Sequence, residues 1–312
     1  MKWTRIFLLF SLLAWSMAGI AERKDAYRFA LLPKVAHPWF ELVHQGADQA
    51  AVMLGDWTGA AFTVEYLPPA RADVAEQNRI LEQAISRGVD GIMIDLLDAD
   101  ANRPLLRRAM ERGIAVVVFD SIAPPGMELV TIGNDFCEQA QLASHRLAKL
   151  IGGRGEVAIM RGIPEAPNHA LRARCHEETL KLYPDIRVVA QPFDYDDIGV
   201  ARDEAIEVMR AFPNLVGWVS CDAAGPIGVG LATKDLGRVG KVRSVGSDDL
   251  PQMIELIREG VVDSSTSTKP RMQGYWSMIS LWQATIGAPM PKRIDTGIGI
   301  VTGRMAQDHK GF

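Results

Sequence analysis

The amino-acid sequence predicts an α/β protein built from two doubly wound parallel sheets. Short apolar runs alternate along the chain with longer segments of helical periodicity, which is the pattern of βαβ crossovers. The runs are too numerous for one small sheet, and the pattern restarts near residue 134. A length of 312 residues also favours two domains, each with a core of its own.

Ten segments are expected to be strands, because short β-like runs alternate along the chain with longer helical stretches. They are 27–33, 62–67, 91–95, 115–120, 129–133, 156–160, 187–193, 217–221, 242–247 and 261–267. Several are almost continuously apolar, as in strands buried on both faces. Segment 73–88 is typical of the helices, because its apolar residues line one helical face and Gly88 closes it.

The first 21 residues have the layout of a secretory signal peptide. "MKWTR" is positively charged, "IFLLFSLLAW" is a short apolar core, and "SMAGIA" supplies small residues. Cleavage is expected after Ala18 or Ala21, and a buried helix is the alternative. No cysteine lies near this point, so no lipid anchor is expected, and the mature chain is predicted to be exported to the periplasm.

Charge and cysteine content exclude several classes of site. The net charge is −4 and no basic run occurs, so nothing favours a nucleic-acid partner. Cys137, Cys175 and Cys221 lack metal-ligand spacing, and an odd number allows at most one disulfide. We expect all three to be small buried residues, with any pairing left open, and we expect neither a metal nor a cofactor.

Ligands of doubly wound sheets bind beyond the carboxyl ends of the strands. Polar and mostly acidic residues follow the apolar runs, namely Lys34, Asp95, Asp120, Asn134, Asp135, Cys221, Asp222, Asp248 and Asp249. Any one acid or amide among them has a simpler explanation as a helix cap. Together they suit a ligand rich in hydroxyl groups, because carboxylates accept strong O–H hydrogen bonds.

Five segments, in order, resemble the type I periplasmic sugar-binding proteins of bacterial ABC transporters, the family that includes ribose-binding protein. The segments are "HPWFELVHQGADQAA", "GVDGIMIDLLDADANRPLLRRAMERGIAVVVFDS", "GRGEVAIMRGIPEAPNHALRARCHE", "GWVSCDAAGPIGVGLA" and "VRSVGSDDLPQMIELIREG". The resemblance implies two α/β lobes joined by a three-crossover hinge. An N-terminal lobe would hold 24–133 plus 269–290, and a C-terminal lobe 134–268 plus 291–312.

The resemblance also implies a ligand site between the lobes. Trp39 and Phe40 match an aromatic pair that stacks on a sugar ring, with Tyr195 as the partner from the second lobe. The alternative places Trp39 in the core and Phe40 at the helix start.

Charged residues would surround the ring in such a site. Asp120 and Asp248 match hydroxyl-binding acids, and Arg174 matches a donor to the ligand. Arg172 is expected on the surface. The alternative reverses the two, with Arg172 as the donor and Arg174 on the surface. Asp95, Asp222 and Thr268 match further polar positions of the family.

Four positions depart from the ribose-binding pattern or add to it. His37 and Cys221 stand where asparagines are expected, and Asp197 stands in place of a second arginine. These changes disfavour ribose and suit another pentose, a hexose, a polyol or an amino-bearing sugar. Lys34 resembles a lysine of the autoinducer-2 and rhamnose receptors, or it is a solvated loop charge.

The predicted function is capture of a small hydroxyl-rich ligand for delivery to an ABC permease. The alternative is a sensor whose closed form docks on a membrane histidine kinase or chemoreceptor. An enzyme is not expected, because the six histidines have no metal spacing and no nucleophile or phosphate-loop motif occurs. A repressor would need a DNA-binding segment where the signal peptide stands, and a monomer is the family expectation.

Overall fold

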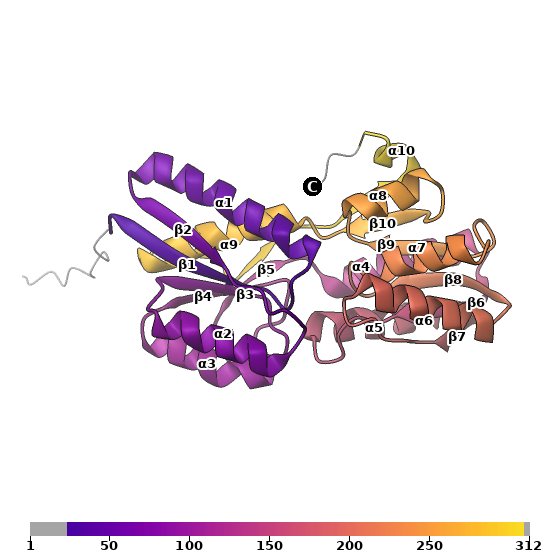
Figure 1. Ribbon diagram of the computed structural model, residues 1–312, viewed down its shortest axis with the longest axis horizontal. Coiled ribbons are helices and arrows are strands. Elements are labelled where there is room, and N and C mark those ends of the chain that lie inside the picture. The colour runs from indigo at the N-terminus through magenta and orange to yellow at the C-terminus, as the bar shows by residue number, and fades with distance from the viewer. Residues whose placement is uncertain (1–23, 309–312) are drawn as a thin grey trace, which may run out of the picture.

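The computed structural model describes residues 24–308, so the predicted signal peptide lies outside the described residues. Two lobes lie side by side along the longest axis of the molecule (Figure 1). Each lobe has one six-stranded sheet with helices on both faces. Both are therefore α/β lobes built on mostly parallel sheets, as the alternation of apolar runs predicts. Between residues 24 and 308, no helix has the length and apolarity needed to span a membrane.

All ten predicted strands are present, with slightly shifted ends. They are β1 (Ala26–Leu32), β2 (Ala61–Tyr66), β3 (Gly91–Ile94), β4 (Ala115–Phe119), β5 (Val130–Gly133), β6 (Arg154–Met160), β7 (Asp185–Ala190), β8 (Leu215–Ser220), β9 (Arg243–Ser247) and β10 (Ser264–Ser267). Two short strands that we did not predict complete the sheets, β11 (Arg293–Asp295) and β12 (Gly299–Thr302).

The helices alternate with the strands. They are α1 (Pro38–Thr58), α2 (Val74–Ser86), α3 (Ala99–Glu111), α4 (Phe136–Leu150), α5 (Pro167–Leu180), α6 (Ile198–Ala211), α7 (Gly225–Asp235), α8 (Pro251–Arg258), α9 (Pro270–Thr285) and α10 (Gly303–Ala306). Aspartates cap several of them, so the capping interpretation is correct for Asp135 at α4. Asp197, which was expected in the ligand site, caps α6.

The two sheets share one topology. Their strand orders are β11-β5-β4-β3-β1-β2 and β12-β10-β9-β8-β6-β7, and all pairs are parallel except β10 with β12. In each lobe the chain first adds a strand on one side and then turns to the other side. This reversal leaves a crevice at the carboxyl ends of β1 and β3, and of β6 and β8, where such sheets bind ligands.

Alternate residues of the central strands pack on opposite helix layers. In β1, Phe29 and Leu31 face the α1 and α9 layer, whereas Ala30 and Leu32 face α2 and α3. In the second lobe, the layers are α4 with α5 and α6 with α7. Because strands buried on both faces lack a polar side, they read as continuous apolar runs in the sequence.

Within residues 24–308 the chain passes between the lobes after β5, after β10, and between β11 and β12. Helix α9 packs on α1 and on β3 and β4, so it belongs to the first lobe (Figure 1). The last passage lies at 296–298 rather than near 290, because β11 pairs with β5 of the first sheet. Segment 293–295 is therefore part of the first lobe, not of the second lobe as expected.

Helices α1 and α9 meet at two glycines. A Cβ atom on Gly274 would lie 1.8 Å from the carbonyl oxygen of Val43, and one on Gly46 would lie 2.0 Å from that of Arg271. We expect Gly274→Ala to lower the free energy of unfolding by about 3 kcal/mol, because the helices must separate to admit the methyl group. Chemical denaturation of the variant measures this loss.

Gly55→Ala is the matched control, because Gly55 also lies inside α1 but its nearest neighbour atom would be 3.4 Å away. Alanine there is expected to stabilise the protein by about 0.5–1 kcal/mol through helix propensity. Equal effects of the two substitutions would show that the close approach of the helices does not matter.

Candidate functional site

The carboxyl ends of the two sheets face each other across a small polar cavity between the lobes. The residues that line it are Lys34, His37, Trp39, Phe40 and Asp120 from the first lobe, and His169, Arg172, Asp196, Asp222, Ala223 and Asp248 from the second. The cavity volume is about 20 Å³, roughly the space of one water molecule. The lobes are therefore closed on each other in this structure.

At the crevice of the first sheet, Lys34 follows β1 and Asp95 follows β3. Their Nζ and Oδ2 atoms are 2.9 Å apart, and both side chains are almost fully buried. Burial raises the pKa of Asp95 well above its usual value, although the nearby Lys34 opposes this change. Lys34 also donates to Asn168 Oδ1 of the second lobe at 3.1 Å. It is thus not the solvated loop charge that we considered.

Asp120, after β4, is the meeting point of the two lobes. Asn168 Nδ2 donates to its Oδ2 at 2.9 Å, and Arg172 Nη2 lies 3.5 Å from its Oδ1. Gln273 of α9 donates to the same Oδ1 at 3.5 Å. Asp120 is 5% exposed, so these contacts form in a nearly dry environment where hydrogen bonds to a charged group are strong.

The arginine in the cavity is Arg172, not Arg174, so the preferred assignment was wrong. Arg172 is 3% exposed, and its Nε donates to Gln139 Oε1 at 2.7 Å. The side chain of Arg174 is 65% exposed and lies 4.0 Å from Glu178. Two positions along a helix are about 200° apart around its axis, so only one of these arginines can face the cavity.

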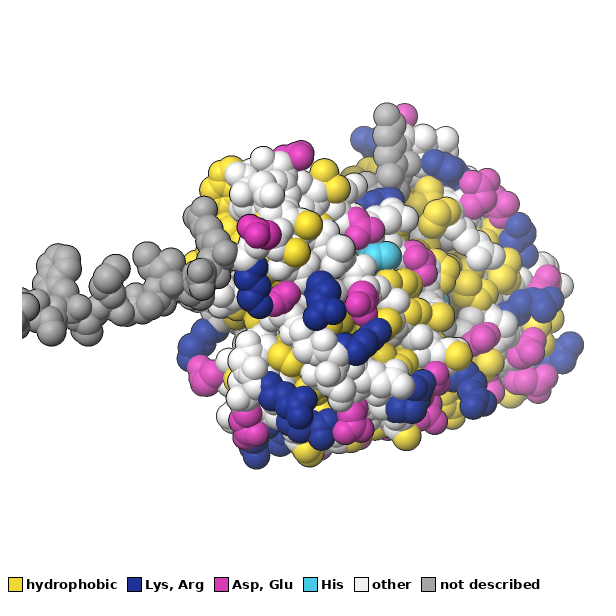
Figure 2. Space-filling view, turned by 60° about the vertical axis from the view of Figure 1, so that its left-hand side comes forward, with side chains coloured by type: hydrophobic (Ala, Val, Ile, Leu, Met, Phe, Trp, Pro, Cys, Tyr) yellow, Lys and Arg dark blue, Asp and Glu magenta, His cyan; other side chains and the backbone are white. Residues whose placement is uncertain are grey.

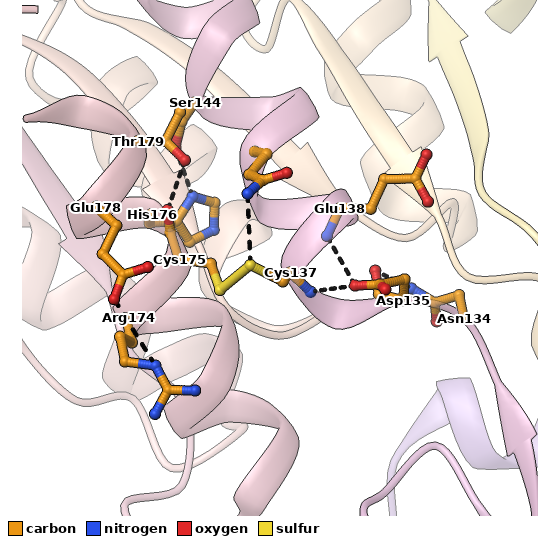
Figure 3. Close-up of a disulfide and its surroundings, with 11 residues drawn as sticks. Asn134, Asp135, Cys137, Glu138, Ser144, Arg174, Cys175, His176, Glu178 and Thr179 are labelled. Carbon is orange, nitrogen blue, oxygen red and sulfur yellow. Dashed lines mark hydrogen bonds and ion pairs between the residues drawn. A yellow bond between two sulfur atoms is a disulfide. The ribbon is translucent and has the colours of Figure 1, made fainter. Parts of the chain in front are cut away.

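A disulfide between Cys137 and Cys175 anchors the cavity-facing helix α5 to the first turn of α4 (Figure 3). The sequence left the pairing of the cysteines open, and the structure pairs these two, while Cys221 is free and buried. Cys137 is only half-buried, so the expectation of three buried cysteines was wrong for this residue. Cys175 directly follows the surface residue Arg174 and lies three positions after Arg172 in sequence. The cross-link thus holds α5 in place against α4, and α5 is the helix that carries Asn168, His169 and Arg172.

His37, Trp39 and Phe40 form the first-lobe wall of the cavity. His37 caps α1, because its Nδ1 accepts from the backbone N–H of Trp39 at 3.2 Å. Trp39 and Phe40 are 4% and 2% exposed and contact each other edge to face, with ring centroids 5.0 Å apart. Both rings belong to the apolar core and also line the cavity, so the two interpretations of this pair are compatible.

Asp248 and Thr268 link the second sheet to the aromatic wall. Thr268 donates through its hydroxyl and its backbone N–H to Asp248 Oδ1, and it accepts from Trp39 Nε1 at 3.1 Å. Burial raises the pKa of Asp248 to about 6, although the bond from Thr268 lowers it. Thr268 and Asp95 do not line the cavity themselves but hold side chains that do.

The second-lobe wall is acidic. Asp222 follows β8 and accepts from the backbone N–H of Gly225 at 2.9 Å, and Asp194 lies beside it. Burial raises the pKa of Asp222 to about 6 and the pKa of Asp194 well above its usual value. His169 lines the same cavity, and burial together with Lys34 and Arg172 lowers its pKa, which keeps the ring neutral.

Three further predicted site residues lie outside the cavity. Tyr195 is 55% exposed, and its ring neighbours Phe193 rather than a ligand site. Asp197 is exposed and caps α6 through the N–H groups of Gly199 and Val200. The Cys221 side chain packs in the core under α4 and α5, and only its carbonyl oxygen receives Arg172, at 3.3 Å.

Backbone strain marks the same region. Among residues 24–308, the non-glycine residues with positive φ are Asp120, Tyr195, Asp196, Asp248 and Lys269. Three of them, Asp120, Asp196 and Asp248, line the cavity. Such conformations cost of order 1–3 kcal/mol each and are held at functional sites by their surroundings. They aim the carboxylates of Asp120, Asp196 and Asp248 into the cavity.

Sequence reasoning missed His169, Arg172 and Asp196 as cavity residues. His169 and Arg172 lie one turn apart on α5, which begins at Pro167, so their spacing was a usable signal. No such signal exists for Asp196, because its position depends on two consecutive positive φ angles at Tyr195 and Asp196.

A wider groove of about 350 Å³ runs beside the crossover from β5 to α4 and is lined by residues such as Ser121, Asn134 and Arg293. The ring of Phe136 separates it from the cavity, and the Arg172 guanidinium lies 4.7 Å above that ring. The smaller cavity is the better candidate, because the buried charges and strained residues converge on it.

Comparison with known proteins agrees with this architecture. A family model described as a periplasmic binding protein domain matches residues 29–289. A crystal structure of an ABC transporter solute-binding protein from Burkholderia graminis in complex with D-arabinose has a TM-score of 0.86. It is 28% identical, with 92% of this chain and 99% of that chain covered.

Two curated relatives also align over most of their length. The D-apiose import binding protein of Actinobacillus succinogenes is 26% identical over 77% of this chain and 75% of its own. The D-allose-binding periplasmic protein of Escherichia coli is 25% identical over 82% of this chain and 84% of its own. The match to the family model covers most of the chain, and the two lobes have the type I fold. The chain therefore belongs to the periplasmic binding protein family.

Proposed function

We propose that the protein binds a monosaccharide or related polyol between its lobes in the periplasm and delivers it to an ABC permease. The single observation that carries this proposal is the closed cavity, in which an aromatic wall faces a ring of buried carboxylates and one arginine. Relatives that bind D-arabinose, D-apiose and D-allose support the same class of ligand.

The chemistry of the walls matches that of a sugar. A sugar ring has C–H groups on its faces, which pack on aromatic rings such as Trp39 and Phe40. Hydroxyl groups surround its edge and donate to carboxylates such as Asp120 and Asp248, while Arg172 donates to ring or hydroxyl oxygens. A site with charged partners on several sides fixes the orientation of a small polar ligand.

Closure is expected to depend on the ligand. In the closed form, Asn168 and Arg172 of the second lobe bond to Asp120 of the first. A cavity of about 20 Å³ is too small for a sugar, so these contacts must rearrange when one enters. Ligand hydroxyls then take over part of the bonding across the lobes, and the ligand stabilises the closed state by its differential contacts.

The docking partner is expected to recognise the closed pair of lobes. On the face seen in Figure 2, basic and acidic side chains are intermixed over both lobes, without one large patch of a single sign. We propose that the monomeric closed protein is the form that the permease receives. No reaction on the ligand is part of this proposal.

Thermal unfolding against a panel of ligands tests the proposal. The chain from residue 22 onward, stripped of bound ligand, would be melted with pentoses, hexoses, polyols and amino sugars. A ligand present at 100 times its dissociation constant adds about 2.7 kcal/mol of stability, which is a clear shift in Tm. A shift with one or a few of them supports a sugar receptor, and no shift with any would refute it.

A further inference from the structure

The cations of the cavity are already paired. Lys34 Nζ lies 2.9 Å from Asp95, and Arg172 Nη2 lies 3.5 Å from Asp120. All four side chains are at most 8% exposed, so each pair forms a nearly neutral unit within the protein. Neither cation is left to balance the acids on the second-lobe wall.

Those acids form a separate cluster of Asp194, Asp196 and Asp222. Within the part of the chain that the structure describes, no Lys, Arg or His nitrogen lies within the 4.0 Å of an ion pair from their carboxylates. Asp194 is 0% and Asp222 is 3% exposed. The carboxyl groups of Asp194 and Asp222 hydrogen-bond to each other. No other group among residues 24–308 donates to the buried oxygens Asp194 Oδ2, Asp196 Oδ1 and Asp222 Oδ2.

Two basic residues of the same lobe, Arg161 and His169, do not supply the missing charge. Arg161 is turned away, with its guanidinium 4.7 Å above the ring of Phe193. His169 accepts from the backbone N–H of Ile163 through Nδ1 at 2.9 Å, so it is neutral with its proton on Nε2.

An independent observation on the first lobe also indicates a ligand with polar atoms at this end of the cavity. His37 Nδ1 accepts from the N–H of Trp39, so the neutral ring carries its proton on Nε2. That Nε2 atom is buried and has no partner among the described residues, and His37 lines the same cavity as Asp222. A donor from one lobe and acceptors from the other thus lack partners in one enclosed space.

Burying carboxylates without a counter-charge is costly, so they must hold protons or receive a cation. A protonated amine offers three N–H donors and the missing positive charge, and its bonds to carboxylates are charge-assisted. We propose that the ligand is a cationic sugar or polyol, an amino sugar or amino alditol, whose ammonium group binds Asp222 and Asp196. This inference rests on the proposed function and specifies its ligand.

Matched pairs of ligands test the inference by titration calorimetry at pH 7. Suitable pairs are D-glucose with D-glucosamine, D-galactose with D-galactosamine, and D-glucitol with 1-amino-1-deoxy-D-glucitol. Each pair differs by one hydroxyl replaced by one ammonium group. We expect the amine of at least one pair to bind about tenfold more tightly or better, a ratio that one charge-assisted contact provides.

Variants then locate the preference. Asp222→Asn keeps an acceptor for the N–H of Gly225 but loses the charge, so the ratio of amine to hydroxyl affinity is expected to fall to about 1. Asp196→Asn is expected to lower the ratio as well, and asparagine is compatible with the positive φ of this half-buried position. Asp248→Asn is the matched control, because Asp248 accepts from Thr268 and lies outside the acidic cluster. It should lower the affinity for both ligands of a pair and leave the ratio of amine to hydroxyl affinity unchanged.

The outcomes separate the two claims. If the hydroxyl ligands bind as tightly as the amines, or if Asp222→Asn leaves a tenfold ratio intact, the amine inference is overturned and the sugar-binding function stands. If no ligand of any pair or of the wider panel binds, the proposed function itself fails, and the inference fails with it.

Discussion

Replacing Asp120 by asparagine is expected to lower ligand affinity by about 10- to 100-fold. A hydrogen bond to a charged group contributes roughly 1.5–3 kcal/mol, and each 1.4 kcal/mol is tenfold in affinity. The side-chain amide of the variant also replaces one acceptor oxygen by an N–H donor. This donor would face the donor groups of Asn168 and Arg172 and weaken the contacts between the lobes. Titration with the ligand identified by the thermal panel measures the loss.

Arg174→Ala is the matched control for this prediction. Arg174 is charged and lies on α5 as Arg172 does, but it is exposed and contacts only Glu178. Its removal should change affinity by less than about twofold, because exposed ion pairs contribute little. If Asp120→Asn also changes ligand affinity by less than about threefold, with an unchanged Tm, then Asp120 is not a ligand-binding residue.

Removing the disulfide is expected to cost about 4 kcal/mol of stability. The cysteines are 38 residues apart in sequence. A cross-link that closes a loop of that size lowers the conformational entropy of the unfolded chain, which stabilises the folded state by roughly 4 kcal/mol. A Cys137→Ser/Cys175→Ser double variant should therefore unfold at lower denaturant concentration. Ligand affinity should also fall, because α5 carries Asn168 and Arg172 and loses its link to α4.

Reduction of the wild-type protein provides the control. A reductant should lower the stability of the wild type to about that of the double variant, and it should leave the stability of the double variant unchanged. Cys221 is buried and free, so it gives no second disulfide to confuse the comparison. Equal stability of the oxidised wild type and the double variant would show that the cross-link has no stabilising role.

Central strands such as β1, β3, β4 and β8 were predictable because they are largely buried on both faces and leave nearly continuous apolar runs in the sequence. The short strand β11 carries no such signal. Arg293 and Asp295 are exposed, and β11 exists because it pairs with β5, more than 150 residues away in sequence. Long-range pairing of this kind is invisible to local patterns.

The first-lobe half of the site was better predicted than the second-lobe half. Lys34, His37, Trp39, Phe40 and Asp120 follow strands or begin a helix, and all line the cavity. Topology places such positions at one edge of the sheet, so order along the chain is enough to find them.

In the second lobe, tertiary contacts decide which residues face the ligand. Arg172 is buried because Asp120 of the other lobe and Gln139 meet it there, and Arg174 lacks such partners. Tyr195 points outward because the chain turns through positive φ angles at Tyr195 and Asp196. The pairing of Cys137 with Cys175 likewise depends on α4 lying beside α5.

The interleaved path of the chain sets the order in which the lobes can fold during synthesis. The sheet of the first lobe lacks the cover of α9 and the edge strand β11 until residues 270–295 have been made. By then every strand of the second lobe except β12 has already emerged. A growing chain therefore cannot finish one lobe before starting the next, as sequential domains do. The nascent first lobe stays incomplete until β11 has been made, after all strands of the second lobe except β12.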